Sequence, residues 1–297
     1  MSKATDKNSY LASQAGKVSL GNEISVNRFG LGTMRLTGQG TLHIWDKPKN
    51  PDSAISLLRR AVELGVNFID TSDAYGPEIA ENLIAEALHP YPEELIIATK
   101  GGLVRDTRSS SHIDGSPEHL KMACENSLKR LKLESIDLYQ LHFPDENIPI
   151  EDSVGALSEL KADGKIRHIG LCNVSVEQLE RARKITPIVS VQARYNLQDR
   201  ATEEMVELCD REELAFVPWY PLGTGDLTEP GGTLDEFATR YDATPAQIAL
   251  AWLLQRSSFM LPIAGTSSVA HLEENLAATA ISLNAEDMTA LSSKFES

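Results

Sequence analysis

The feature that most constrains the fold of this chain is a regular alternation of short apolar segments with segments of helical spacing. Residues 53–64 illustrate the helical spacing, because Leu57 and Ala61 fall on one face of a helix. Eight such strand–helix units follow one another without a linker. Strict alternation of this kind predicts a parallel sheet covered by helices.

The elements expected from these patterns cover most of the chain. The strands lie at residues 29–34, near 68, from 95, at 136, and over 166–172, 188–192, 215–219 and 260–263. The helices cover residues 53–64, 78–88, 117–131, 150–162, 176–184, 202–213, 245–254 and 271–278, with a short final helix at 287–291. Ahead of them, residues 17–26 alternate in polarity about Gly21-Asn22, which predicts a β-hairpin.

Two architectures satisfy the alternation, a closed barrel and a doubly wound open sheet. Gly30-Leu31-Gly32 lacks the third glycine of a dinucleotide-binding loop and precedes a loop rather than a helix. Polar residues end several different strands, which is typical of barrel enzymes. We therefore expect residues 17–297 to form one (β/α)8 TIM barrel with an N-terminal β-hairpin. Residues 1–16 are expected to form a disordered polar tail.

The composition argues against several classes of function. A formal net charge of -15 disfavours nucleic acid or an anionic membrane as the partner. No run of about eighteen apolar residues occurs, and the polar start of the chain lacks the apolar core of a signal peptide. Three widely spaced cysteines and scattered histidines fit neither a disulfide framework nor a metal site. We expect a cytoplasmic protein, monomeric or weakly self-associating, that acts on a small molecule.

Three successive expected strands end in residues that can do chemistry. The first apolar run ends on Asp70, the next on Lys100 and the third on His142. Tyr75 follows the first of them in a short polar turn. In a parallel barrel these strand ends converge on one pocket at the C-terminal face.

Several motifs together form the signature of a known family. They are FIDTSDAYG at 68–76, ATKGG at 98–102, IDLYQLH at 136–142, GKIRHIGLCN at 164–173, VQARYN at 191–196 and GTSSVAHLEENLAA at 265–278. On these motifs the chain resembles the aldo-keto reductase superfamily over residues 18–291, and most closely its bacterial branch of pyridoxal reductase-like members. The resemblance implies a barrel that reduces aldehydes or ketones to alcohols with a nicotinamide cofactor.

The resemblance assigns the reaction to Asp70, Tyr75, Lys100 and His142, and the chemistry of these side chains suits it. Tyr75 is the natural proton donor, but its free pKa of about 10 is high for donation near neutrality. The Lys100 ammonium would lower that pKa by favouring the phenolate, and Asp70 would keep Lys100 charged. His142 would donate to or orient the carbonyl oxygen.

For the cofactor the resemblance implies a larger set of residues. The amides of Asn173 and Gln192 would bind the nicotinamide carboxamide, and Trp219 would stack on its ring. Cys172 stands where the family usually has serine, and a thiol makes a weaker hydrogen bond. The whole implied set is Gly32, Thr33, Asp70, Cys172, Asn173, Gln192, Trp219, Tyr220, Pro221, Leu222, Gly223, Gly265, Thr266, Ser267, His271, Glu274 and Asn275.

The segment after the last strand bears on the choice between NADP(H) and NAD(H). The family commonly places Lys or Arg there to bind the 2′-phosphate, yet residues 262–275 contain neither. Hydroxyls and backbone amides can hold a phosphate, but a charge-assisted bond is stronger. NADP(H) is expected from the resemblance, and NAD(H) stays open.

The substrate is expected at the mouth of the barrel. The expected substrate residues are Met34, Arg35, Trp45, Tyr75 and His142. Arg35 either binds an anionic substrate or pairs with a nearby carboxylate, and both alternatives stay open.

Other functions on the same barrel also stay open. One is a regulatory nicotinamide-binding subunit of a larger assembly, and another is an NADH-dependent alcohol dehydrogenase. A third is an aldolase that uses Lys100 as a Schiff base. That chemistry needs a neutral amine, which Asp70 as a close partner would oppose.

Overall fold

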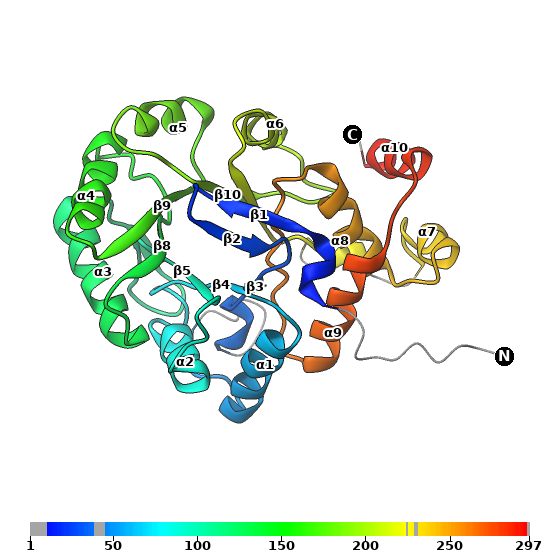
Figure 1. The fold of residues 1–297 in the computed structure, drawn as a ribbon, viewed down its shortest axis with the longest axis horizontal. Coiled ribbons are helices and arrows are strands. Elements are labelled where there is room, and N and C mark those ends of the chain that lie inside the picture. Colours follow the sequence, from blue (N-terminus) through cyan, green and yellow to red (C-terminus); the bar gives the residue numbers. More distant parts are fainter. Residues whose placement is uncertain (1–10, 39–44, 224, 229–230, 296–297) are drawn as a thin grey trace.

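A parallel sheet of seven strands curls through the centre of the molecule (Figure 1). The structure is a computed structural model and describes residues 11–38, 45–223, 225–228 and 231–295. In spatial order the strands are β3 (Leu31–Gly32), β4 (Phe68–Asp70), β5 (Ile96–Gly101), β8 (Ile136–Leu141), β9 (Ile166–Cys172), β10 (Ser190–Arg194) and β11 (Ala215–Trp219). Every neighbouring pair is parallel.

The segment 260–263 closes this sheet into a barrel. Parallel bridges join it to Gly30, just before β3, and to Phe216 in β11. It is not the continuous strand that we expected, because Pro262 has no N–H to donate to a ladder. The predicted (β/α)8 TIM barrel is confirmed, with its eighth strand reduced to two bridges.

Helices follow the strands and cover the outside of the barrel (Figure 1). They are α1 (Pro51–Glu63), α2 (Ile79–Leu88), α3 (Pro117–Leu131), α4 (Ile150–Ala162), α5 (Val176–Arg183), α6 (Glu203–Arg211), α8 (Pro245–Arg256) and α9 (Val269–Ala277). Outside this alternation lie α7 (Asp235–Arg240), which the sequence did not predict, and the terminal α10 (Ala285–Lys294). Short 3-10 turns complete the set: η1 (Ala12–Ala15), η2 (Met34–Leu36), η3 (Asp226–Thr228) and η4 (Ala278–Ala280).

Capping side chains fix where several helices begin. Ser116 accepts the N–H of His119 at the start of α3, where proline occupies the first turn. Ser268 caps α9 in the same way, so that this helix begins before the expected position 271. Asn284 caps α10, which is longer than the expected segment 287–291 at both ends.

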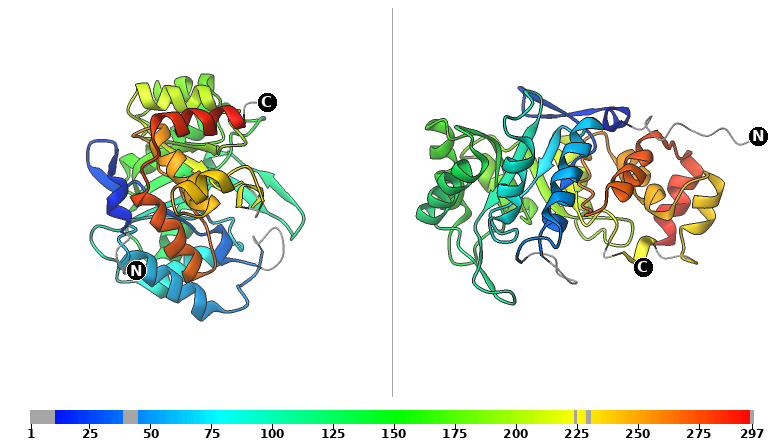
Figure 2. Two further views of the ribbon diagram at one scale, coloured as in Figure 1. Left: turned by 90° about the vertical axis from the view of Figure 1, so that its right-hand side faces the viewer. Right: turned by 90° about the horizontal axis from the view of Figure 1, so that it is seen from below.

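The N-terminal hairpin closes one end of the barrel. Strand β1 (Lys17–Leu20) pairs antiparallel with β2 (Ile24–Asn27). Its inward side chains share one hydrophobic cluster with Phe68, Leu138 and Val217 from the barrel interior. The predicted N-terminal β-hairpin is confirmed, and Figure 2 shows it in dark blue on one side of the molecule.

Residues 11–16 differ from the expected polar tail. They include η1, in which Ala12 is buried and donates its N–H to the backbone oxygen of Leu64 at 3.0 Å. Residues 1–10 of the expected tail lie outside the described part of the chain. Packing against the end of α1 therefore orders the chain before residue 17.

A second hairpin lies between β5 and α3, where the sequence predicted no strand. Strand β6 (Leu103–Arg105) pairs antiparallel with β7 (Ser111–Ile113). The sequence did not reveal it because β7 is exposed on both faces and shows no alternation of polarity. The hairpin follows β5, and Figure 2 shows it in blue-green, projecting on the side opposite the N-terminal hairpin.

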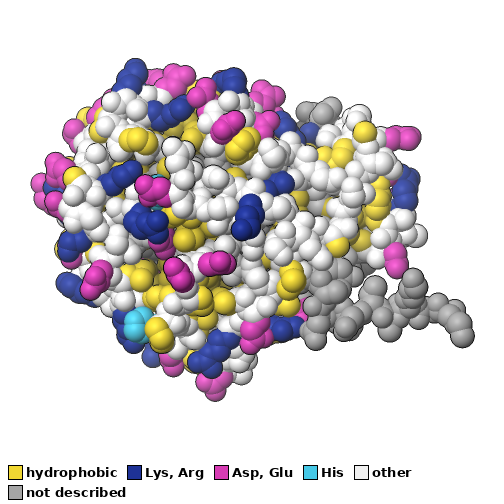
Figure 3. Space-filling model, in the orientation of Figure 1, with side chains coloured by type: hydrophobic (Ala, Val, Ile, Leu, Met, Phe, Trp, Pro, Cys, Tyr) yellow, Lys and Arg dark blue, Asp and Glu magenta, His cyan; other side chains and the backbone are white. Residues whose placement is uncertain are grey.

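Charged side chains of both signs are interspersed over the face that carries the N-terminal hairpin (Figure 3). Ion pairs also join neighbouring elements of the barrel, including Arg181 of α5 with Glu151 of α4 at 2.6 Å and Lys165 with Glu125 of α3 at 3.0 Å. Among the described residues, no helix is both long enough and apolar enough to cross a membrane.

Candidate active site

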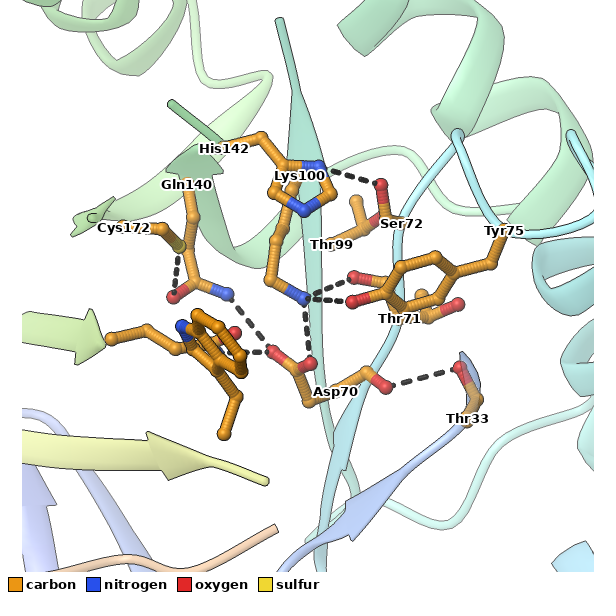
Figure 4. A network of polar contacts seen from close by, with 12 residues as sticks. Thr33, Asp70, Thr71, Ser72, Tyr75, Thr99, Lys100, Gln140, His142 and Cys172 are labelled. Atoms are coloured by element: carbon orange, nitrogen blue, oxygen red, sulfur yellow. Dashed lines mark hydrogen bonds and ion pairs between the residues drawn. The ribbon is translucent and has the colours of Figure 1, made fainter. Parts of the chain in front are cut away.

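Lys100 lies at the centre of a buried polar cluster at the C-terminal ends of β4 and β5 (Figure 4). The parallel register sets Asp70 beside Ala98, so Lys100, two residues along, projects on the same side. Its Nζ donates to Asp70 Oδ2 at 2.6 Å, to the Thr71 backbone oxygen at 2.9 Å and to the Tyr75 hydroxyl at 3.3 Å. Three acceptors match the three hydrogens of an ammonium.

Burial and charge act in opposite directions on Lys100. Burial alone lowers the pKa of its amine, but the Asp70 carboxylate and the Tyr75 phenol outweigh it, so the pKa is raised above its ordinary value. The amine is therefore charged at neutral pH. A Schiff-base aldolase needs this amine neutral, so the structure argues against that alternative.

The proton affinity of Tyr75 differs from our expectation. Burial raises the pKa of Tyr75 to about 12, although Lys100 acts to lower it. We expected the ammonium to dominate, but removal of the phenolate from water is the larger effect. The hydroxyl is consequently protonated near neutrality and available to donate.

The Asp70 carboxylate is held by more than its ion pair. Its Oδ1 accepts from Gln192 Nε2 at 2.8 Å and from Gln140 Nε2 at 3.1 Å. The Thr33 hydroxyl donates to the Asp70 backbone oxygen at 3.0 Å. Gln140 was not among the expected site residues, although an amide inside the apolar run of β8 was a signal for it.

His142 is buried beside Tyr75, with ring centroids 6.0 Å apart in an edge-to-face arrangement. Its Nδ1 lies 3.2 Å from the Ser72 hydroxyl, and its ring stacks on Phe143. Burial, with the charges of Lys100 and Arg105, holds the pKa of His142 well below its ordinary value. The imidazole is neutral, and Ser72 occupies one of its two nitrogens, which leaves the other for a ligand.

These residues form one wall of a pocket of about 310 Å³, which lies within the range of small-ligand sites. The expected residues that line it are Gly32, Thr33, Met34, Arg35, Asp70, Tyr75, His142, Asn173, Gln192, Trp219, Tyr220, Pro221, Leu222, Gly223 and Gly265. The other lining residues, which lie outside the expected set of site residues, are Leu103, Arg105, Phe143, Gly225, Thr228, Ile263 and Ala264.

The structure does not bring every expected residue to this pocket. Trp45 is half-buried and pairs with Gly76 rather than lining the wall. The Cys172 thiol lies 3.6 Å from Gln140 Oε1, and burial raises its pKa, so it stays protonated. The other expected residues outside the pocket lining are Lys100, Thr266, Ser267, His271, Glu274 and Asn275.

The pocket wall offers polar groups that fit a carboxamide. Asn173 donates to the His142 backbone oxygen at 3.0 Å and accepts from Trp219 Nε1 at 2.9 Å, so its amide is fixed. The Gln192 amide is anchored through its nitrogen on Asp70, which leaves its oxygen for a donor in the pocket. A planar amide has donors and an acceptor that complement this pair.

Glycines bring backbone close together where the pocket approaches α9. A side chain at Gly265 would place its Cβ 3.0 Å from the Gly32 backbone oxygen and 3.4 Å from Arg35 Cγ. Gly223 has φ +63 and Gly225 has φ +119, conformations that favour glycine. All three glycines line the pocket, and backbone without side chains suits the close approach of a pyrophosphate.

Comparison with known proteins defines the class. The Aldo/keto reductase family model matches residues 28–296. The chain therefore belongs to the aldo/keto reductase family and is an NAD(P)H-dependent oxidoreductase.

Individual relatives are similar along almost their whole length. An uncharacterized oxidoreductase of Schizosaccharomyces pombe is 48% identical over 286 residues, which cover 96% of this chain and 92% of that protein. Pyridoxine 4-dehydrogenase of Escherichia coli K12 is 43% identical over 274 residues, covering 90% and 94%. Among solved structures, the thermostable aldo-keto reductase Tm1743 bound to the inhibitor epalrestat has a TM-score of 0.82 at 33% identity, covering 93% and 98%. An aldo-keto reductase of Klebsiella pneumoniae with NADPH has a TM-score of 0.78 at 25% identity, covering 94% of each chain.

Proposed function

We propose that this protein reduces aldehydes or ketones to alcohols with NADPH, and that Tyr75 is the general acid. One observation carries the proposal. The Lys100 ammonium joins the Asp70 carboxylate to the Tyr75 hydroxyl at the wall of the pocket. A proton donor beside a fixed positive charge is what protonation of a carbonyl oxygen requires.

Each residue has a distinct part in this reaction. The nicotinamide, when bound, supplies the hydride that goes to the carbonyl carbon. Tyr75 donates its proton to the carbonyl oxygen, and Lys100 stabilises the phenolate that remains. The neutral His142 orients that oxygen through the ring nitrogen that Ser72 leaves free.

For the cofactor we propose NADP(H) in preference to NAD(H). Arg35, which was expected to contact the substrate, packs against Gly265 in the segment where the family commonly binds the 2′-phosphate. It supplies a cation that residues 262–275 lack. The Klebsiella pneumoniae relatives with NADP and with NADPH support the same choice.

For the substrate, pyridoxal-like aldehydes are the first candidates. The support is the similarity to the Escherichia coli pyridoxine 4-dehydrogenase. We propose a cytoplasmic location on the composition and on three free, buried cysteines. A monomer or weak homo-oligomer is proposed as well, and light scattering during size-exclusion chromatography tests it.

The test of the function is NADPH consumption with a panel of aldehydes, in the wild type and in Tyr75→Phe. The variant loses only the transferable proton, so turnover should fall by about 10²- to 10⁴-fold while NADPH binding is retained. Tyr91→Phe is the matched control, because its hydroxyl donates to the Leu131 backbone outside the pocket. Unchanged reduction in Tyr75→Phe would remove Tyr75 from the role of acid.

A further inference from the structure

Two arginines differ from all the others in the described part of the chain. Each of the rest hydrogen-bonds a backbone oxygen or pairs with an acid. Arg35 and Arg105 have no such partner among the described residues, and both line the pocket. In a chain of net charge -15, acids outnumber bases, so most cations find an acidic partner. Two arginines without one in the same pocket therefore suggest that an anionic ligand binds them.

The two arginines lie on different elements of the wall. Arg35 packs against Gly265, so the phosphates of the proposed cofactor account for it. Arg105 lies on β6 of the hairpin that follows β5. Its charge acts on both Tyr75 and His142, which places it at the reacting end of the pocket.

Arg105 is poorly solvated for a charged group. Its Nε is buried and has no hydrogen-bond partner among the described residues. Burial lowers the pKa of its guanidinium, since the charged form loses water without gaining a counter-ion. A buried donor left without a partner is destabilising, and an incoming acceptor would relieve it.

The acids that flank the hairpin, or that contact the segment after it, are already engaged. Asp106 accepts from His112 Nδ1 at 3.0 Å, and Asp114 accepts from the Ser116 backbone N–H at 3.0 Å. Asp145 accepts from the Gly115 backbone N–H at 3.0 Å. None of these carboxylates is bonded to the guanidinium of Arg105, so its fork of donors is left for a ligand.

We propose that the physiological substrate is a carbonyl compound that carries an anionic group, a carboxylate or a phosphate, and that Arg105 binds this group while Tyr75 and His142 hold the carbonyl oxygen. This inference rests on the proposed function and narrows its substrate class: among pyridoxal-like aldehydes it favours those that carry such a group over pyridoxal itself. Two oxygens of a carboxylate or of a phosphate match the guanidinium fork in two parallel hydrogen bonds. Leu103 and Phe143 line the same pocket and are apolar, so neither can bind the anionic group in place of Arg105.

Matched substrate pairs test the proposal directly. Succinic semialdehyde against butanal isolates a carboxylate, and glyceraldehyde 3-phosphate against glyceraldehyde isolates a phosphate. For each pair we would measure the ratio of kcat/KM, anionic over neutral, in the wild type and in Arg105→Gln. The ratio should fall by about 10- to 100-fold in the variant, mainly through KM, for the pair that matches the natural group. The pair with the larger wild-type ratio identifies carboxylate or phosphate.

Arg108→Gln is the matched control. Arg108 is exposed in the connection of the same hairpin and pairs with Asp46, outside the pocket lining. The ratio should stay unchanged in this variant, and equal thermal unfolding curves of the two variants would show that the hairpin remains folded. A ratio that is the same in Arg105→Gln and the wild type for both pairs would overturn the inference.

A second measurement separates this inference from the proposed function. If no carbonyl compound is reduced, the proposed function fails, but the anion site is still testable by calorimetric titration with succinate and with inorganic phosphate. Binding that is lost in Arg105→Gln and kept in Arg108→Gln supports the site. Equal binding in the two variants, or none in the wild type, contradicts it.

Discussion

The pairing of Asp70 with Lys100 allows one perturbation to be worked through in detail. In Asp70→Asn one carboxylate oxygen becomes an NH2 group. At the Oδ2 position this group would face the Lys100 ammonium, which lies 2.6 Å away. At the Oδ1 position it would face the amide nitrogens of Gln140 and Gln192. Either orientation places one hydrogen-bond donor against another, and Lys100 loses its buried counter-ion.

The expected loss of stability is large. Removing one partner of a buried ion pair costs about 3–5 kcal/mol in the free energy of unfolding. The loss should depend on pH. In the variant, burial lowers the folded-state pKa of Lys100 below its unfolded value of about 10.4, so the charged form penalises the folded state. The penalty is full at low pH and shrinks as rising pH removes the proton.

Urea denaturation followed by tryptophan fluorescence measures this loss at neutral and at alkaline pH. Asp163→Asn, at the exposed C-cap of α4, is the matched control and should change stability by less than about 0.5 kcal/mol. A loss below about 1 kcal/mol in Asp70→Asn, or one that does not shrink with rising pH, would refute a buried charged pair.

Two further outcomes follow from buried groups. Because the pKa of Tyr75 is raised to about 12, its hydroxyl keeps its proton below that pH. The rate of carbonyl reduction should therefore stay level between about pH 6 and 9 and decline only as the pH approaches the pKa of Tyr75. A pH–rate profile that already falls near pH 7 for loss of a proton from the enzyme would contradict the assignment. Gly101→Ala would place a Cβ onto the buried Tyr139 hydroxyl and should cost about 1–3 kcal/mol of unfolding free energy. Gly155→Ala, which meets nothing, should be neutral or stabilising, and equal denaturation midpoints of the two variants would contradict the overpacking.

The parts of the fold predictable from the sequence are those that repeat. Alternating strand and helix patterns predicted the barrel, because buried parallel strands and amphipathic helices have distinct periods. The prediction of a continuous eighth strand was wrong, because Pro262 interrupts the hydrogen-bond ladder although the segment keeps its apolar pattern. The β6–β7 hairpin was missed because its short strands are stabilised by pairing with each other and not by an apolar face.

The candidate site shows the same division. Asp70, Lys100 and His142 end apolar runs, so the topology alone brings them together. The net pKa of Tyr75 could not be predicted, because it depends on how far burial outweighs Lys100. Arg105 has no sequence signal, since its significance is the lack of a partner in the folded chain.

The central claim is that this pocket carries out hydride transfer from a nicotinamide to a carbonyl carbon, with Tyr75 supplying the proton. The most direct test uses NADPH deuterated at the transferring position of the nicotinamide ring, with pyridoxal and succinic semialdehyde as substrates. Mass spectrometry of the alcohol product then shows where the label goes. We predict that the wild type places the deuterium on the former carbonyl carbon and that Tyr75→Phe forms little of this product. An alcohol formed without the label, or equal labelling by the variant, would contradict the account.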